Sequence, residues 1–177
     1  MAKSSKAFIL FLVPALCFLS FLSSVSADAD DFDRFLIQGS VYCDTCRVQF
    51  FTRISNYLKG ATVRLECKHR ETGNTTLTVE AVTDLAGAYS MEVTGDHEEE
   101  LCEIVLAKSP DPECSEVSHD EYLRNAARIS LTANDGIATN ETRIVNPLGF
   151  MRKEPLADCP IVFKELGLGP DGQLINI

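Results

Sequence analysis

Two cysteines, Cys43 and Cys46, stand three positions apart in the stretch Gln38–Arg47 and constrain this chain more than any other feature. The residues that lead into them alternate in character, with Phe35 and Ile37 on one face, which is typical of a β-strand. If both cysteines form disulfides, the end of this strand is tied to two distant parts of the chain at once. Whether they do depends on the compartment in which the chain folds.

The first 27 residues predict a secretory signal. Lys3 and Lys6 supply the positive end, residues 7–21 are almost wholly apolar, and small residues complete the segment. An N-terminal membrane anchor would need roughly 20 clean apolar residues, whereas Pro14 breaks this run and serines follow it. We therefore expect cleavage after Ala27, a protein secreted to the extracellular space or cell wall, and no transmembrane segment.

Removal of the signal takes Cys17, one of the seven cysteines, and leaves an even number. In a secreted chain this predicts three disulfides, and counting alone leaves many pairings open. Zinc is a rival ligand for Cys43 and Cys46, but a second closely spaced ligand pair is missing and secretion oxidises thiols. A thioredoxin-like redox pair would need strands that alternate with helices, and these do not. We expect no metal and no other cofactor.

The formal net charge of −10 becomes −12 when the two lysines of the signal leave with it. Acids gather in three runs, at residues 28–33, 96–103 and 111–121. A field of this sign repels phosphate, which argues against nucleic acid or an anionic membrane as a partner. Basic partners, and Ca²⁺ held in pectic wall, stay open beside the plain contribution of charge to solubility.

Short alternating segments separated by turn residues predict an all-β fold. Two of them place a cysteine, Cys67 or Cys102, on the apolar face, so these two cysteines are natural partners. Asp84 stands three residues before Gly87, which predicts a turn closed by the Asp84 carboxylate, with Tyr89 starting the returning strand. The spacing of the segments predicts one small antiparallel β-sandwich or partly closed barrel, stapled by disulfides.

This domain is expected over residues 35–166, between an acidic arm at 28–34 and a C-terminal tail at 167–177. Local patterns predict a two-turn helix at 121–128, a further strand beginning at 129–131, a crossing segment at 146–150 and a short helix or strand at 161–166.

The motif Gly39-x-Val41-Tyr42-Cys43-Asp44-x-Cys46-Arg47 resembles the opening signature of the plant pollen Ole e I allergen and extensin family. The other features of that family follow in its order: Cys67, Thr83–Tyr89, Cys102, Cys114, Asn146–Phe150 and Cys159. The resemblance covers nearly the whole chain after the signal. It implies a small antiparallel β-barrel or sandwich, with pairs Cys43–Cys114, Cys46–Cys159 and Cys67–Cys102.

The non-cysteine positions of the signature are Gly39, Tyr42, Asp44 and Arg47. Asp44 suits the capping of a turn and Arg47 an ion pair with an acid, and a ligand contact is the alternative role for both. Tyr42 points away from the Val41 face, so it is either exposed or packed beneath a loop.

Two N-glycosylation sequons begin at Asn74 and Asn140, both in predicted surface loops. Asn140 lies close to the position at which the family commonly carries its glycan, so we favour it over Asn74.

No catalytic centre emerges from the sequence. The histidines, His69, His97 and His119, stand singly in polar turns and predict surface side chains. Asp96–Glu100 offers carboxylates to Ca²⁺ but lacks the order of an EF-hand, and a solvated charge run is the simpler interpretation. No pair of acids stands out for glycoside hydrolysis. We expect no enzyme activity.

The resemblance implies an extracellular, disulfide-stabilised glycoprotein that acts by binding in pollen or growing cell wall, with a receptor ectodomain or cell-wall polymer as partner. We expect a monomer. The alternative from another class is a secreted hydrolase or hydrolase inhibitor. For an inhibitor, Ser109–Cys114 is the loop to inspect, because it ends in a cysteine.

Overall fold

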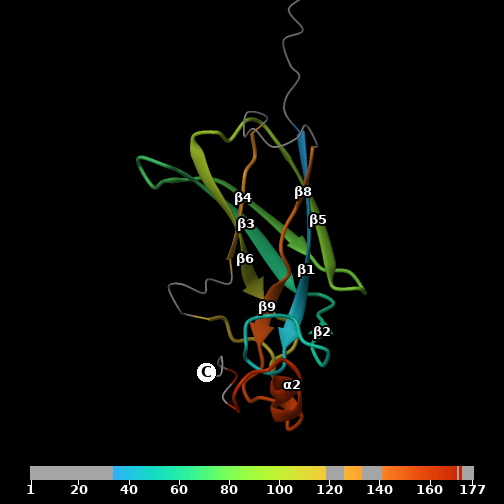
Figure 1. Cartoon of the computed structure of the whole chain (residues 1–177). Helices are drawn as coiled ribbons and strands as arrows, with labels where there is room; N and C mark the ends of the chain where they lie inside the picture. The colour runs from blue at the N-terminus through green and yellow to red at the C-terminus, as the bar shows by residue number, and fades with distance from the viewer. Residues whose placement is uncertain (1–33, 119–125, 133–140, 171, 173–177) are drawn as a thin grey trace, which may run out of the picture. The chain divides into compact units, whose positions relative to one another are not determined.

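The structure, a computed structural model, describes residues 34–118, 126–132, 141–170 and 172 (Figure 1). The chain divides into a unit of Met1–Asp31 and a unit of Phe32–Ile177, and all described residues belong to the second. The expected signal and nearly all of the acidic arm therefore lie outside them. The described elements are β1 (Arg34–Asp44), β2 (Asn56–Tyr57), β3 (Thr62–His69), β4 (Thr75–Val82), β5 (Ala88–Thr94), β6 (Glu100–Lys108), β7 (Ala126–Ile129), β8 (Thr142–Ile144), β9 (Leu148–Met151) and α2 (Cys159–Glu165).

Strand β1 is the centre of the first sheet. Its first half pairs antiparallel with β5, from Arg34 opposite Thr94 to Ser40 opposite Ala88, and parallel with β8. Its second half pairs parallel with β9 and antiparallel with β2. Every other strand of this sheet is therefore placed by its pairing with β1.

The second sheet has the order β4-β3-β6-β7, all antiparallel. In β3, buried Val63, Leu65 and Cys67 alternate with partly exposed polar residues, which is the pattern of a strand covered on one face. The turn before β5 has the predicted form: the Asp84 carboxylate accepts hydrogen bonds from the N–H of Ala86 (2.8 Å) and Ala88 (2.9 Å).

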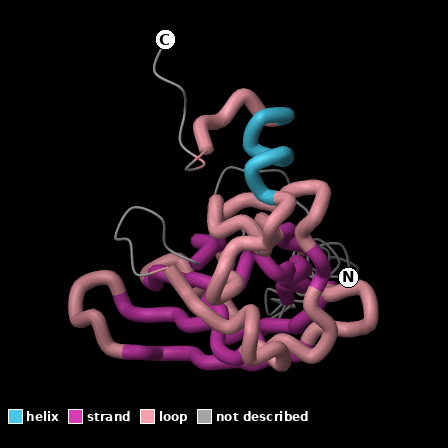
Figure 2. Tube along the Cα trace, turned by 90° about the horizontal axis from the view of Figure 1, so that it is seen from below, coloured by secondary structure: helices cyan, strands magenta, loops and turns pink. Residues whose placement is uncertain are grey.

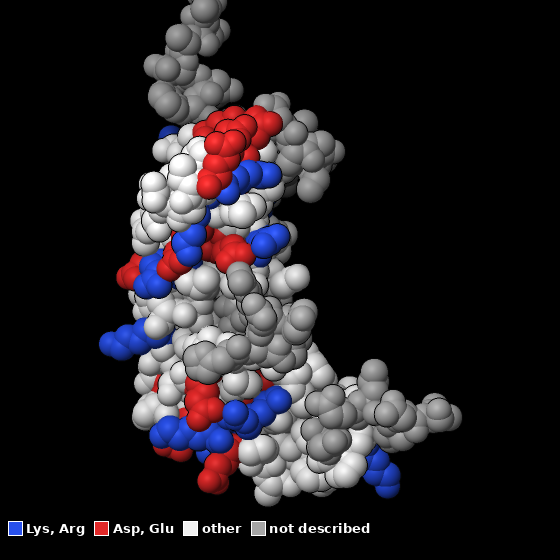
Figure 3. Space-filling model, turned by 90° about the vertical axis from the view of Figure 1, so that its left-hand side faces the viewer, with Lys and Arg blue, Asp and Glu red and all other residues white. Residues whose placement is uncertain are grey.

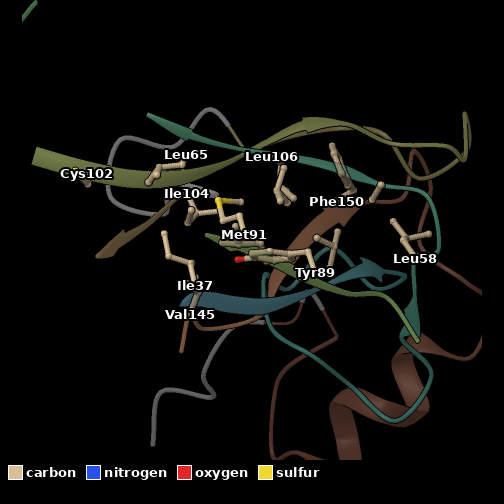
Figure 4. Packing of buried hydrophobic residues seen from close by; sticks show 14 of the residues in the cluster. Ile37, Leu58, Leu65, Tyr89, Met91, Cys102, Ile104, Leu106, Val145 and Phe150 are labelled. Atoms are coloured by element: carbon tan, nitrogen blue, oxygen red, sulfur yellow. The ribbon is translucent and has the colours of Figure 1, made fainter. Parts of the chain in front are cut away.

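The two sheets pack face to face, and their inward side chains form the main core. Figure 4 shows Leu65, Ile104 and Leu106 pointing from the second sheet toward Ile37 and Met91 of the first. The fold is thus an all-β sandwich of two sheets and not a closed barrel.

A second, smaller apolar cluster lies under α2. Cys46, Cys159 and Phe163 are buried there, with four partly buried neighbours: Val48, Ile54, Leu156 and Leu168. Figure 1 shows α2 beyond the ends of β1 and β9, and Figure 2 shows the helix outside the strands.

The structure joins Cys43 to Cys114, Cys46 to Cys159 and Cys67 to Cys102, with Cα–Cα distances of 5.9, 5.5 and 4.0 Å. These are the pairs that the family resemblance implies. Cys67 and Cys102 are register partners on β3 and β6. The other two bridges fix the end of β1.

Several local expectations were wrong. Ala126–Ile129 is strand β7, paired with β6, and not the last part of a helix at 121–128; residues 121–125 of that predicted helix lie outside the described residues. Leu131 is buried but belongs to no strand. The expected crossing segment at 146–150 contains most of β9. For residues 161–166 the sequence left helix and strand open, and the structure shows the helix, because most of this segment lies in α2.

Acidic and basic side chains are interspersed on the molecular face shown in Figure 3. On the second sheet they form ion pairs, such as Arg64 with Glu66 (2.7 Å) and Arg128 with Glu103 (3.2 Å). Such exposed pairs contribute little stability each, so their main effect is a polar cover over the sheet. No helix within the described residues is long and apolar enough to cross a membrane.

Candidate functional site

The chain reverses direction directly after β1 because the Asp44 carboxylate holds it. Asp44 is fully buried, and its two oxygens accept hydrogen bonds from the backbone N–H of Cys46 (3.2 Å) and Gln49 (2.6 Å). Between these anchors, Arg47 and Gln49 adopt left-handed backbone conformations, with φ of 61° and 62°. Such conformations are unfavourable for residues with a Cβ, so the surrounding bonds must hold them in place.

Arg47 ties this loop to two segments that are distant in sequence. Its Nη1 donates to Glu116 Oε2 at 2.5 Å, to the carbonyl of Arg152, and to the carbonyl of Lys153 at 3.3 Å. Backbone bonds between Glu116 and Met151 join the same two segments to each other. The Nη1 group of Arg47 therefore serves as a three-way clamp, which joins its own loop to the segments at Glu116 and at Arg152–Lys153.

A groove of about 700 Å³ opens beside this clamp. Its walls are Arg47, Gln49, residues 115–118 and Met151. Among the described residues that line it, Glu116 is the one carboxylate, and Arg47 holds it in an ion pair. The groove thus combines a guanidinium, an amide, hydroxyls and a thioether, which is a set of groups for recognition by hydrogen bonding and packing.

Two disulfides lock the walls of the groove. Cys43–Cys114 lies at one wall, directly before the lining residues 115–118, and Cys46–Cys159 fixes the residue next to Arg47. The site is therefore held by covalent bonds as well as by Asp44.

Tyr42 is only 3% exposed, so of its two expected placements the structure shows the one beneath a loop. Its ring lies against Gly149 of β9, where an added Cβ would come within 2.6 Å of the ring, and the ring of Phe51 from the following loop covers it. Burial, and then the negative charge of Asp44, raises the pKa of Tyr42 to about 12.

Gly39 has a matching arrangement on the other side of β1. It stands opposite Tyr89 in the ladder, and an added Cβ would lie 2.3 Å from the Tyr89 hydroxyl oxygen and 2.6 Å from its Cζ. The signature glycine therefore makes room for a core tyrosine, and its role is packing.

Asn74 is exposed in the turn between β3 and β4. Asn140 lies outside the described residues, so the structure places only one of the two sequons.

One histidine is not the surface side chain that the sequence predicted. His97 Nδ1 lies 2.8 Å from Glu100 Oε2, both side chains are mostly buried, and His97 Nε2 is buried without a hydrogen-bond partner in the described structure. These two groups lie within 4.8 Å of the sulfurs of Cys67 and Cys102. Because those sulfurs form a disulfide, they are not thiolate ligands, and the pair leaves too few donors for a transition metal. His119 lies outside the described residues.

The segment Ser109–Cys114 is a tight turn. Ser109 Oγ and the backbone of Asp111 are hydrogen-bonded in both directions, and the Asp111 carboxylate accepts from Glu113 N–H at 2.9 Å. A protease cleft that recognises an extended peptide adds it as a strand, so this loop does not have the shape of a substrate-like inhibitor.

Together, the two packed sheets, the three disulfides and the locked groove define a small, disulfide-stabilised β-sandwich protein. A crystal structure of the major plantain pollen allergen Pla l 1 has the same fold, with a TM-score of 0.64 and 34% sequence identity, over 71% of this chain and 99% of that one.

The chain belongs to the family described as Pollen protein Ole e 1 like, whose sequence profile matches residues 33–167. A pollen-specific protein-like chain of Arabidopsis thaliana is 66% identical over 95% of this chain and 98% of its own length. The pollen allergen Che a 1 of Chenopodium album is 55% identical over 95% and 96%, and an Olee1-like protein of Betula pendula is 52% identical over 97% and 98%. All of these names describe pollen proteins or allergens, and none is the name of an enzyme.

Sequence reasoning did not single out Glu116, Gln49, Phe51 or Tyr57. Only the consecutive aromatics Phe50 and Phe51, in an otherwise polar stretch, gave a signal that could have been followed.

Proposed function

We propose that this protein is a secreted, glycosylated binding module of pollen or growing plant tissue, which engages a receptor ectodomain or a cell-wall polymer and turns over no substrate. The single observation that carries the proposal is the locked groove beside Arg47. A binding surface whose shape is fixed before the partner arrives loses little conformational freedom on association. Two disulfides, a buried carboxylate and the Arg47 clamp give this groove that property.

The names of the relatives support the setting, because they are pollen proteins from several plants. The composition of the groove supports binding rather than turnover. General acid–base catalysis requires a titratable group that is free to exchange protons, whereas the groove's carboxylate, Glu116, is held by Arg47.

Affinity capture from plant wall and membrane extracts tests the proposal. The bait is the mature glycosylated protein, and the negative control is the same protein after reduction and alkylation. Ser115→Arg fills the groove without removing the Arg47 clamp, and Ser90→Arg places the same charge on an exposed position of β5. We expect an extracellular protein or polymer to be retained by the wild type and by Ser90→Arg, and to be lost with Ser115→Arg. Equal retention by both variants would show that the groove is not part of the surface that contacts the partner.

A further inference from the structure

An aromatic column runs from the edge of the core to the surface near β2. At its base is Tyr42, buried and packed against Gly149. Phe51 meets Tyr42 edge to face, with ring centroids 5.3 Å apart and an interplanar angle of 69°. The base of the column is therefore fixed by the core on one side and by a loop residue on the other.

Tyr57 forms the outer end of the column. Its ring centroid lies 5.0 Å from that of Phe51, with an angle of 30° between the planes. Two rings lying side by side in one plane have centroids at least about 6 Å apart, because carbon atoms in contact are separated by roughly 3.5 Å. The rings of Phe51 and Tyr57 therefore meet as a tilted pair, with part of their faces in contact. Tyr57 is 51% exposed and Phe51 is 42% exposed, so both residues leave surface open to solvent.

The position of Tyr57 is also fixed by the backbone. Tyr57 is the register partner of Tyr42, and its Cβ lies so close to Gly87 that a side chain at residue 87 would come within 2.7 Å of it. An exposed aromatic side chain held in this way loses little rotamer freedom when a partner binds.

The segment that carries the column holds little charge. Residues 48–58 contain a single charged side chain, Arg53, and Glu165 engages it through two hydrogen bonds of 2.6 and 2.9 Å. Exposed Lys59 directly follows this band. The formal net charge of −10 opposes a polyuronate, and one lysine does not offset it, so a neutral ligand suits this band best. Its polar groups include the exposed amide of Asn56 and the amide of Gln49 at the groove.

We propose that Tyr57, stacked on Phe51, is a docking platform for a neutral, pyranose-based polysaccharide of the plant cell wall. The axial C–H groups of a pyranose ring form an apolar face that packs on an aromatic ring, while its equatorial hydroxyls bond to amides. The platform supplies both kinds of group. This inference rests on the proposed function, of which it names the class of partner.

Solution binding to defined probes tests this proposal. The probes are cellohexaose and soluble xyloglucan, with oligogalacturonate as the charged comparison, and binding is followed by saturation-transfer NMR and by tyrosine fluorescence, since the chain has no tryptophan. The variants are Tyr57→Ala, Tyr57→Phe, which keeps the ring, and Ile144→Ala, which truncates an exposed apolar side chain on β8. Unchanged circular dichroism and Tm confirm that each variant is folded.

We expect a neutral probe to bind the wild type, Tyr57→Phe and Ile144→Ala with similar Kd, and Tyr57→Ala to weaken it at least tenfold. Binding that does not change in Tyr57→Ala would overturn the proposal, as would binding of oligogalacturonate alone. If no glycan binds while groove-dependent capture of an extracellular protein persists, the polysaccharide platform is wrong and the proposed function stands. If that capture fails as well, both are wrong.

Discussion

Replacing Gly39 with alanine should destabilise the fold through one identifiable clash. The added Cβ would lie 2.3 to 2.9 Å from three atoms of the Tyr89 side chain, the hydroxyl oxygen and two ring carbons. Tyr89 is 4% exposed and packed in the main core. To restore van der Waals separation the ring must move by about 1 Å, and overpacking of a dense core typically costs about 1–3 kcal/mol. Alanine also lowers the conformational entropy of the unfolded chain relative to glycine, which stabilises the folded protein by about 0.4–1 kcal/mol. We expect a net loss of about 1 kcal/mol in the free energy of unfolding.

Urea unfolding with the disulfides intact, followed by circular dichroism, measures this loss. The urea midpoint should fall by about 0.5 M for a domain of this size. Gln38→Ala, at the neighbouring exposed position, is the matched control and should change little. In a Tyr89→Leu background the ring atoms are gone, so Gly39→Ala should cost at least about 1 kcal/mol less than in the wild type. An equal cost in both backgrounds would refute the clash with Tyr89 as the reason for the glycine.

Four further predictions concern the buried groups of the sandwich and the site. Tyr89→Phe should raise Tm by a few degrees, because it removes a buried hydroxyl that has no hydrogen-bond partner among the described residues, worth about 1 kcal/mol; a lower Tm contradicts this. The double variant Cys46→Ala/Cys159→Ala removes a disulfide of sequence separation 113, and its free energy of unfolding in urea titrations should be about 4 kcal/mol lower than that of the wild type. A difference below about 1 kcal/mol would refute a stabilising role for this disulfide. Asp44→Asn leaves one of two backbone N–H groups without its acceptor, so calorimetry should show that the free energy of unfolding falls by about 1–3 kcal/mol. An unchanged Tm would show that these hydrogen bonds do not stabilise the fold. In the folded protein the pKa of Tyr42 is raised from 10 to about 12, so its neutral hydroxyl contributes a stability that is complete below pH 10 and is lost as the pH rises toward 12. The urea midpoint of the wild type should therefore fall more steeply over that interval than the midpoint of Tyr42→Phe. Parallel curves for the two proteins would contradict the raised pKa.

The sandwich could be predicted from the sequence wherever a strand has one covered face. In β1 and β3 the side chains alternate with period two, so Phe35 and Ile37, or Leu65 and Cys67, identify the inner face directly. The Asp84 turn was predictable for a related reason, because a short carboxylate bonding nearby N–H groups acts within a few residues.

Prediction failed where a distant partner overrides a local pattern. The capping-box pattern at Ser118 favours a helix, yet Ala127 is paired with Ile104 of β6, and the ladder determines the conformation there. The same holds for Leu148–Met151, which reads as a loop until β1 supplies a parallel partner.

Most of the candidate site could not be predicted for the same reason. The ion pair between Arg47 and Glu116 spans 69 residues, and no glycine marks the left-handed conformations at Arg47 and Gln49. Asp44 and Arg47 were identified from the signature, but the groove and the Phe51–Tyr57 stack exist only in three dimensions.

The change in burial along β1 explains why the site lies where it does. The first half of the strand alternates between buried and exposed residues, whereas Val41, Tyr42, Cys43 and Asp44 are all buried. At this end the strand therefore has a second cover, formed by the loop after Asp44 and the cluster under α2. That cluster has three buried residues and four partly buried ones, too little apolar surface to hold a layer in place by itself.

The Cys46–Cys159 bridge supplies what this thin layer lacks, because it joins the layer to α2 covalently. A layer fixed by a disulfide, by Asp44 and by the Arg47 clamp does not depend on its outward side chains for stability. Its surface residues, among them Gln49, Phe51 and Tyr57, are therefore the ones that the proposed recognition would use. The same reasoning accounts for the signature: its cysteines, aspartate and arginine hold the layer on which these surface residues lie.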